Sequence, residues 1–133
     1  MSRILLIDAD PAETSALAQR LVAAGHTVSI EHDGWLGLER VLAEVFDIVV
    51  TEMLLPRRDG AELIGELRGL QPRLPVIART GGDDEFDVQD LLDLAQYHGA
   101  AGGLSKGLDL DVVVTYLGRW IERARLENEE GAR

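Results

Sequence analysis

The chain has 133 residues, which fits one domain, and a hydrophobic content of 46% that can supply a core. The absence of cysteine excludes disulfides and thiolate chemistry, and no apolar run is long enough to span a bilayer or act as a signal peptide, so we expect a cytoplasmic protein. The net charge of −11 argues against nucleic acid or a membrane as partner and suits protein partners.

The chain begins with an apolar run followed by a helix start. Residues 4–7 are typical of a short buried strand. Next come Asp10 and Pro11, which predict an N-cap and a first helical residue, and Gly25 predicts the end of that helix. The expected apolar stripe of this helix is Leu17, Leu21 and Val22.

The same alternation continues to the end of the chain. We expect further strands over residues 26–31, 47–51, 75–80 and 100–105. We expect helices that begin at Asp33 and Asp59, the first of them running through Leu38, Val41 and Leu42, and further helices over residues 86–97 and 109–127. Residues 1–127 would form a single domain and residues 128–133 a flexible tail, with no output domain after it.

Five strands that alternate with five helices predict an α/β fold with an open parallel sheet. In such sheets a site lies beyond the carboxyl ends of the strands. The residues at those ends are Asp8, Glu52, Thr80 and Lys106. The sequence therefore predicts that two acids, a hydroxyl and an ammonium converge on one edge. GxGxxG and P-loop patterns are absent, so nucleotide binding of those types is not expected.

The order of these segments resembles the receiver domain of bacterial two-component signalling over nearly the whole chain. Residues 4–11 resemble its first strand and acidic turn, and residues 47–60 resemble the segment that carries the phosphoacceptor. Residues 75–80 resemble the strand that ends in the switch threonine, and residues 99–106 the strand that ends in a lysine. The resemblance implies a flavodoxin-like, doubly wound sheet with strand order 2-1-3-4-5 and a role in phosphorelay signal transduction.

The resemblance also implies a chemistry. In the family an aspartate at the strand end accepts a phosphoryl group, while Mg²⁺ and the lysine neutralise its charge. The threonine hydroxyl then moves, and an aromatic ring on the last strand follows it.

The sequence departs from that pattern at several positions. Glu52 stands where the resemblance places the phosphoacceptor aspartate, and Ala9 stands where it places the main metal ligand. Gly103 replaces the switch aromatic, and Gly107 replaces the proline after the lysine. We therefore expect a degenerate phosphoacceptor site without phosphotransfer, no enzyme activity and no cofactor.

Two alternatives remain for the acids at the site. The carboxylate of Glu52 either imitates a phosphorylated aspartate or forms a structural ion pair with Lys106. Asp8 and Glu52 remain as candidates for a residual Mg²⁺ site. Asp10, in the acidic turn, is better explained as a helix cap.

A surface for protein contacts is expected over residues 86–97, 100–105 and 109–127, with homodimerisation as one use. Tyr116 and Trp120 lie four residues apart and share a helix face, with Phe86 and Gly103 on the neighbouring segments. The alternative is that the two aromatic residues cover the edge of the core. The acidic stretch of residues 81–87 either reshapes this surface or is a solvated loop.

The sequence thus predicts a stand-alone atypical receiver domain that acts by phosphorylation-independent protein–protein interaction. The alternative is a working Mg²⁺-dependent phosphoacceptor with weak metal binding. A flavodoxin-like nucleotide or flavin binder would share the fold, but the phosphate loop that it needs after the first strand is missing.

Overall fold

The computed structural model describes residues 2–131 and contains one parallel sheet in the order β2-β1-β3-β4-β5. The strands are β1 (Arg3–Ile7), β2 (Thr27–Glu31), β3 (Ile48–Thr51), β4 (Val76–Thr80) and β5 (Gly102–Ser105). The helices are α1 (Pro11–Ala23), α2 (Gly34–Ala43), α3 (Gly60–Leu70), α4 (Val88–His98) and α5 (Leu110–Gly131). The predicted fold class and strand order are confirmed.

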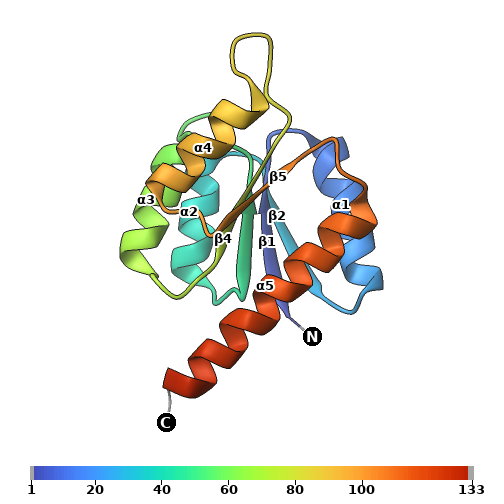
Figure 1. The fold of residues 1–133 in the computed structure, drawn as a ribbon, viewed down its shortest axis with the longest axis vertical. Coiled ribbons are helices and arrows are strands. Elements are labelled where there is room, and N and C mark those ends of the chain that lie inside the picture. The colour runs from blue at the N-terminus through green and yellow to red at the C-terminus, as the bar shows by residue number, and fades with distance from the viewer. Residues whose placement is uncertain (1, 132–133) are drawn as a thin grey trace.

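The sheet is covered on both faces, so its central strands are buried on both sides (Figure 1). Alternate residues of each strand enter different cores. On one face Leu5, Val49 and Ala78 pack against α2, α3 and α4, and on the other face Leu6, Val50 and Ile77 pack against α1 and α5. This arrangement explains why β1, β3 and β4 are continuous apolar runs.

Aspartate caps fix where the first four helices begin. The side chains of Asp10, Asp33, Asp59 and Asp87 accept hydrogen bonds from backbone N–H groups in the first turns of α1, α2, α3 and α4. Each cap satisfies a donor that has no partner inside its helix. Each of the first four strands is thereby followed by a helix with a defined start at the carboxyl edge of the sheet.

Two residues of the expected apolar stripes lie outside the core. Val22 of α1 is 57% exposed and Leu42 of α2 is 61% exposed, while their neighbours Leu21 and Val41 are buried. Adjacent helical residues are separated by about 100° around the axis, so a second apolar residue in a row turns away from a narrow stripe.

The last helix is longer than predicted, and residues 128–131 are helical rather than a frayed tail. Ion pairs along α5 join Glu122 to Arg125 and Arg123 to Glu127, and such pairs stabilise exposed helix. The rest of the predicted tail, residues 132–133, lies outside the described residues. No helix in the described part of the chain is long and apolar enough to cross a membrane.

Candidate functional site

The sheet brings three charged side chains together at its carboxyl edge. Ile7 of β1 pairs with Thr51 of β3, so the residues that follow them, Asp8 and Glu52, are side by side. The ammonium of Lys106, just after β5, lies 2.7 Å from Asp8 Oδ2 and 3.0 Å from Glu52 Oε1. The predicted convergence of these residues is present in the structure, and Lys106 bridges both carboxylates.

The backbone fixes the Glu52 carboxylate from its other side. Oε2 of Glu52 accepts hydrogen bonds from the backbone N–H groups of Met53 and Leu54. Gly60 allows this tight turn, because a Cβ there would lie 2.5 Å from the Glu52 carbonyl oxygen. With Lys106 on one oxygen and two amides on the other, the carboxylate has little freedom to move.

The charge state of Lys106 follows from these contacts. Burial alone would lower the pKa of its ammonium, but the hydrogen bonds to Asp8 and Glu52 and their negative charges raise the pKa above its ordinary value of 10.5. Lys106 is therefore a cation at neutral pH, and its charge is shared by two carboxylates that are themselves almost fully buried.

The acidic turn contributes only one carboxylate to this cluster. Asp8 Oδ1 accepts a hydrogen bond from the Asp10 N–H at 3.0 Å, and the Asp8 carbonyl lies 3.0 Å from His32 Nδ1. The Asp10 side chain is exposed and accepts from the N–H of Ala12 at 2.9 Å as the cap of α1. Its predicted role as a cap is confirmed, and Ala9 has no ligand to offer.

Thr80 completes the edge from β4. It is fully buried, its carbonyl accepts a hydrogen bond from the Lys106 N–H at 3.0 Å, and its Oγ1 accepts one from the Gly82 N–H at 3.2 Å. In the described part of the chain, no hydrogen bond joins Thr80 to Glu52. Thr80 thus positions the backbone of Lys106 and the start of the next loop.

Space near the two glycines of β5 is already taken. A Cβ on Gly103 would lie 3.0 Å from Leu92 Cδ2 of α4, and a Cβ on Gly102 would lie 2.0 Å from the Tyr116 hydroxyl. Tyr116 and Trp120 are half-buried over this end strand with their rings 6.5 Å apart. Both aromatic residues therefore cover the edge of the core while keeping an exposed side.

A second ion pair, in which only Arg79 is buried, lies beside the site and is not among the residues that the sequence analysis singles out. Arg79 is 4% exposed, and its guanidinium Nη2 lies 3.1 Å from Glu13 Oε2 of α1. Arg79 and Glu13 line one small cavity together with Asp8 and Glu52. The signal was available, because Arg79 interrupts the apolar run of β4 and a buried guanidinium requires a carboxylate.

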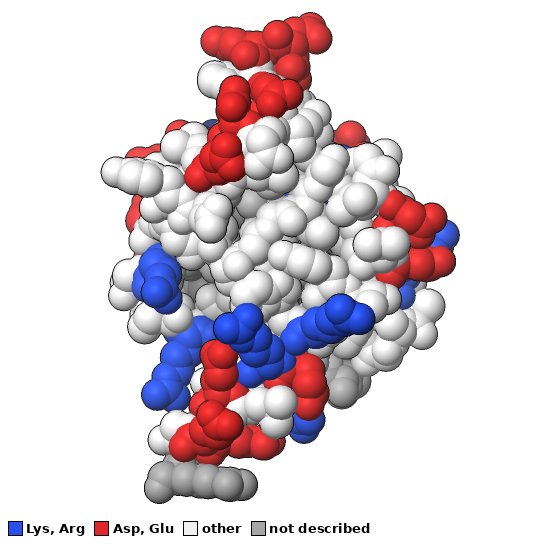
Figure 2. Space-filling view, in the orientation of Figure 1, with Lys and Arg blue, Asp and Glu red and all other residues white. Residues whose placement is uncertain are grey.

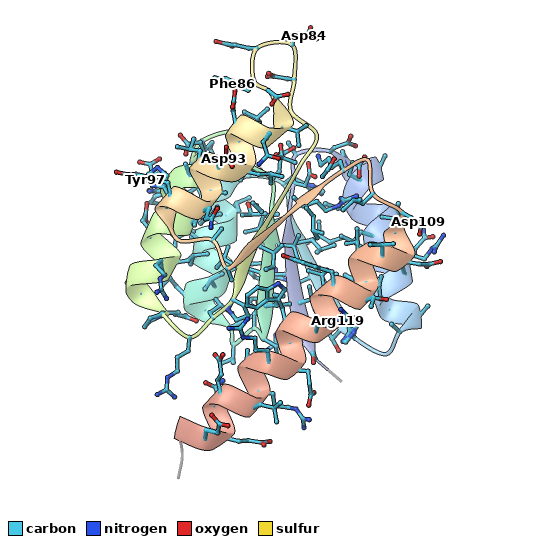
Figure 3. The ribbon with its side chains drawn as sticks, viewed as in Figure 1. Asp84, Phe86, Asp93, Tyr97, Asp109 and Arg119 are labelled. Atoms are coloured by element: carbon cyan, nitrogen blue, oxygen red, sulfur yellow. The ribbon has the colours of Figure 1, made fainter. Side chains whose placement is uncertain are left out.

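The remaining residues singled out in the sequence lie away from this cluster. Phe86 precedes α4 rather than beginning it, is 44% exposed, and belongs to a loop that projects from the carboxyl edge (Figure 3). On the exposed face of α4, Tyr97 is 85% exposed and Leu94 is 42% exposed.

Chemically, the cluster is one ammonium held between two carboxylates. Within residues 2–131, no three His, Cys, Asp or Glu side chains are grouped so that they could hold a metal ion. The two carboxylates that meet at the site both face the single Lys106 ammonium, which compensates one of their two negative charges.

Comparison with known proteins gives consistent matches. The family model described as the response regulator receiver domain matches residues 4–117. The response regulator MprA of Mycobacterium ulcerans is 32% identical over 130 residues, which cover 98% of this chain and 54% of that protein. The chain spans about half the length of the curated relatives it matches.

Solved structures show the same fold. A CheY-like receiver domain protein from Methanospirillum hungatei JF-1 superposes with a TM-score of 0.86 at 23% identity, covering 96% of this chain and 98% of that one. The signal receiver domain of an HD domain-containing protein from Pseudomonas fluorescens Pf-5 gives a TM-score of 0.86 at 26% identity, covering 96% and 92%.

Proposed function

This chain belongs to the response regulator receiver domain family of two-component signalling, and from that premise we propose that it is an atypical receiver that acts by protein–protein contact without being phosphorylated. The observation that carries the proposal is the ion cluster at the carboxyl edge. Lys106, the cation that would neutralise a phosphoryl group, is held by Asp8 and Glu52 at 2.7 and 3.0 Å.

The position of Glu52 argues against phosphotransfer. Its side chain is one methylene longer than aspartate, and its carboxylate is fixed by Lys106 and by the amides of Met53 and Leu54. Nucleophilic attack is sensitive to misplacement of about 1 Å. We propose that Glu52 does not accept a phosphoryl group and that the protein is not an enzyme.

The donor set also does not fit the Mg²⁺ that the family implies. Mg²⁺ requires near-octahedral oxygen coordination, normally with one or two carboxylates. Here Asp8 and Glu52 both face an ammonium, Ala9 has no oxygen to offer, and Asp10 caps α1. A metal ion would have to displace Lys106 from both carboxylates, so we propose that no Mg²⁺ is required.

Of the two alternatives for Glu52, the contacts favour a structural ion pair. A carboxylate that imitated a phosphoryl group would accept a hydrogen bond from the Thr80 hydroxyl. Among residues 2–131 the Thr80 Oγ1 accepts from the Gly82 N–H but makes no hydrogen bond to Glu52, which bonds to Lys106 and to the amides of its own turn. Gly103 offers no ring to relay a movement of Thr80, and Leu92 already lies over it.

We propose the face formed by α4, β5 and α5 as the surface for protein partners. The face toward the viewer is largely uncharged between its upper and lower ends (Figure 2). Phe86, Leu94 and Tyr97 expose apolar area there, and Tyr116 and Trp120 add aromatic edges. Such area on an acidic chain suits proteins rather than nucleic acid or a membrane.

The proposal is tested by incubating the protein with Mg²⁺ and acetyl phosphate and measuring its intact mass. We expect no mass increase and no Mg²⁺-dependent change in Trp35 and Trp120 fluorescence. The control is the double variant Ala9→Asp/Glu52→Asp, which restores the acid pair and the shorter nucleophile. A wild-type mass increase of one phosphoryl group would overturn the proposal in favour of a working phosphoacceptor.

A further inference from the structure

Two oppositely charged features lie at opposite ends of the molecule. The acidic loop, residues 83–87, projects beyond the carboxyl edge of the sheet and contains four acids and Phe86 (Figures 1 and 3). The arginine groove lies at the amino edge and is lined by Arg68, Arg73 and Arg123 with Trp120. Figure 2 shows the loop as mostly acidic, and a row of basic side chains across the lower half of the same face with acidic side chains directly below it.

The acidic loop is an ordered projection. Asp83 Oδ1 accepts hydrogen bonds from the N–H groups of Glu85 and Phe86 at 2.9 and 2.7 Å, and the Asp83 N–H donates to the Phe86 carbonyl at 3.0 Å. Asp83, Asp84, Glu85 and Asp87 are all exposed. Because these hydrogen bonds already order the turn, its charged side chains and the Phe86 ring lose little conformational entropy on binding.

The arginine groove contains arginines that form no ion pair in the described residues. It measures about 460 Å³, and no ion pair involves Arg68 or Arg73 among residues 2–131. Arg123 stacks on the Trp120 ring at 5.0 Å and shares its charge with Glu127. Glu127 also lines the hollow, so the unpaired charge there comes from Arg68 and Arg73. In a chain with 24 acidic and 13 basic residues, two such arginines at one hollow favour an acidic ligand.

We propose that the arginine groove binds the acidic loop of a second copy of this chain, so that copies associate head to tail. The loop supplies carboxylates for the guanidinium groups, and Phe86 supplies an aromatic ring for the wall formed by Trp120. The loop projects from the carboxyl edge of the sheet (Figure 1), and the groove is lined by residues that precede β4 and β5 at the amino edge, so a copy cannot fill its own groove.

The geometry determines what kind of assembly results. A head-to-tail contact uses two different surfaces, so it leaves one loop and one groove free and continues into an open chain of copies. A five-residue tip covers less area than the roughly 1,200 Å² of a stable interface, so the association is weak and rises with concentration. In about 0.1 M salt the Debye length is about 10 Å. Salt therefore screens the overall repulsion between copies, which acts over longer distances, more than it screens ion pairs in direct contact.

Sedimentation velocity of the full chain over a concentration series tests the proposal. We expect the weight-average sedimentation coefficient to rise with concentration in about 0.1 M salt and to stay at the monomer value in about 1 M salt, where the Debye length is about 3 Å. The loop variant Asp84→Lys/Glu85→Lys should stay monomeric, although its smaller net charge reduces repulsion. The control Glu39→Lys/Glu62→Lys makes the same charge change at exposed positions of α2 and α3 and should associate like the wild type.

Mixing two variants gives the decisive result. The groove variant Arg73→Gln/Arg123→Gln, whose neutral side chains attract neither the native loop nor the lysine loop, should also be monomeric by itself. An equimolar mixture with the loop variant should form a species that stops at the dimer, because only one intact loop and one intact groove can meet. A monomeric wild type, a loop variant that associates like the wild type, or a mixture without dimer would each overturn the proposal.

Discussion

Lys106 bridges two carboxylates and is the residue on which the site depends most. Replacing it in Lys106→Met leaves Asp8 and Glu52 close together in a buried place without a cation. Removing one partner from a buried ion pair costs about 3–5 kcal/mol. We expect the free energy of unfolding in urea to fall by about 3 kcal/mol. The control Arg119→Met, at an exposed arginine of α5, should change it by less than about 0.5 kcal/mol.

The pH dependence of this stabilisation follows from the raised pKa of Lys106. Because folding raises the pKa of Lys106, the protonated ammonium stabilises the folded state. This stabilisation is complete at pH values below the ordinary pKa of 10.5, and it is lost as the pH rises through the pKa of the folded state. The difference in unfolding free energy between the wild type and Lys106→Met should therefore stay constant from neutral pH to about 10. It should shrink at higher pH, and a difference that already declines between pH 7 and 9 would contradict a protonated Lys106 bridge.

Arg79 and Glu13 form a buried pair with unequal partners. Arg79 cannot lose its proton, and its side chain is 5% exposed, whereas the Glu13 side chain is 34% exposed and reaches water. We expect Glu13→Leu to destabilise the fold by more than Arg79→Leu, because only the first leaves a buried charge unpaired. The free energy of unfolding of the double variant, measured in urea, should be close to that of the wild type. Equal losses in the two single variants would show that the pair is not buried as described.

At the scale of a helix, α3 offers two glycines with opposite surroundings. A Cβ on Gly60 would lie 2.5 Å from the Glu52 carbonyl oxygen and 2.6 Å from the Met53 Cα, whereas a Cβ on Gly69 meets nothing within 4 Å. Gly60→Ala should lower the thermal midpoint and displace Glu52. Gly69→Ala should raise the unfolding free energy by about 0.5–1 kcal/mol through helix propensity. A Gly60→Ala variant as stable as the wild type would mean that the turn after β3 can shift to accommodate a Cβ at little energetic cost, which would contradict this account.

Element boundaries could be predicted where local chemistry determines them. The caps Asp10, Asp33 and Asp59 appear in the sequence beside the helices that they start, and the structure confirms all three. Apolar spacing predicts Val22 and Leu42 in the stripes of α1 and α2, but both are exposed. The width of the buried stripe depends on how each helix packs on the sheet. The end of α5 depends on ion pairs along the helix, which a search for apolar periodicity overlooks.

For the whole molecule, the parallel sheet makes part of the site predictable. All strands run the same way, so Asp8, Glu52, Thr80 and Lys106 had to reach one edge. Which of these side chains form ion pairs could not be deduced from the sequence, because pairing depends on side-chain directions and on distances across the edge of the sheet. The Lys106 bridge and the Arg79–Glu13 pair are both of this kind. The opposite placement of the acidic loop and the arginine groove likewise appears only in three dimensions.

The most direct test of a closed, phosphorylation-independent site is an amide NMR spectrum of the ¹⁵N-labelled protein, recorded before and after adding Mg²⁺ and acetyl phosphate at neutral pH. We predict that the signals of residues 52–54, 80–82 and 106 keep their positions, because Lys106 continues to hold Asp8 and Glu52. Saturable shifts clustered at those amides would contradict the account and show that the carboxyl edge still binds the metal ion or the phosphoryl group.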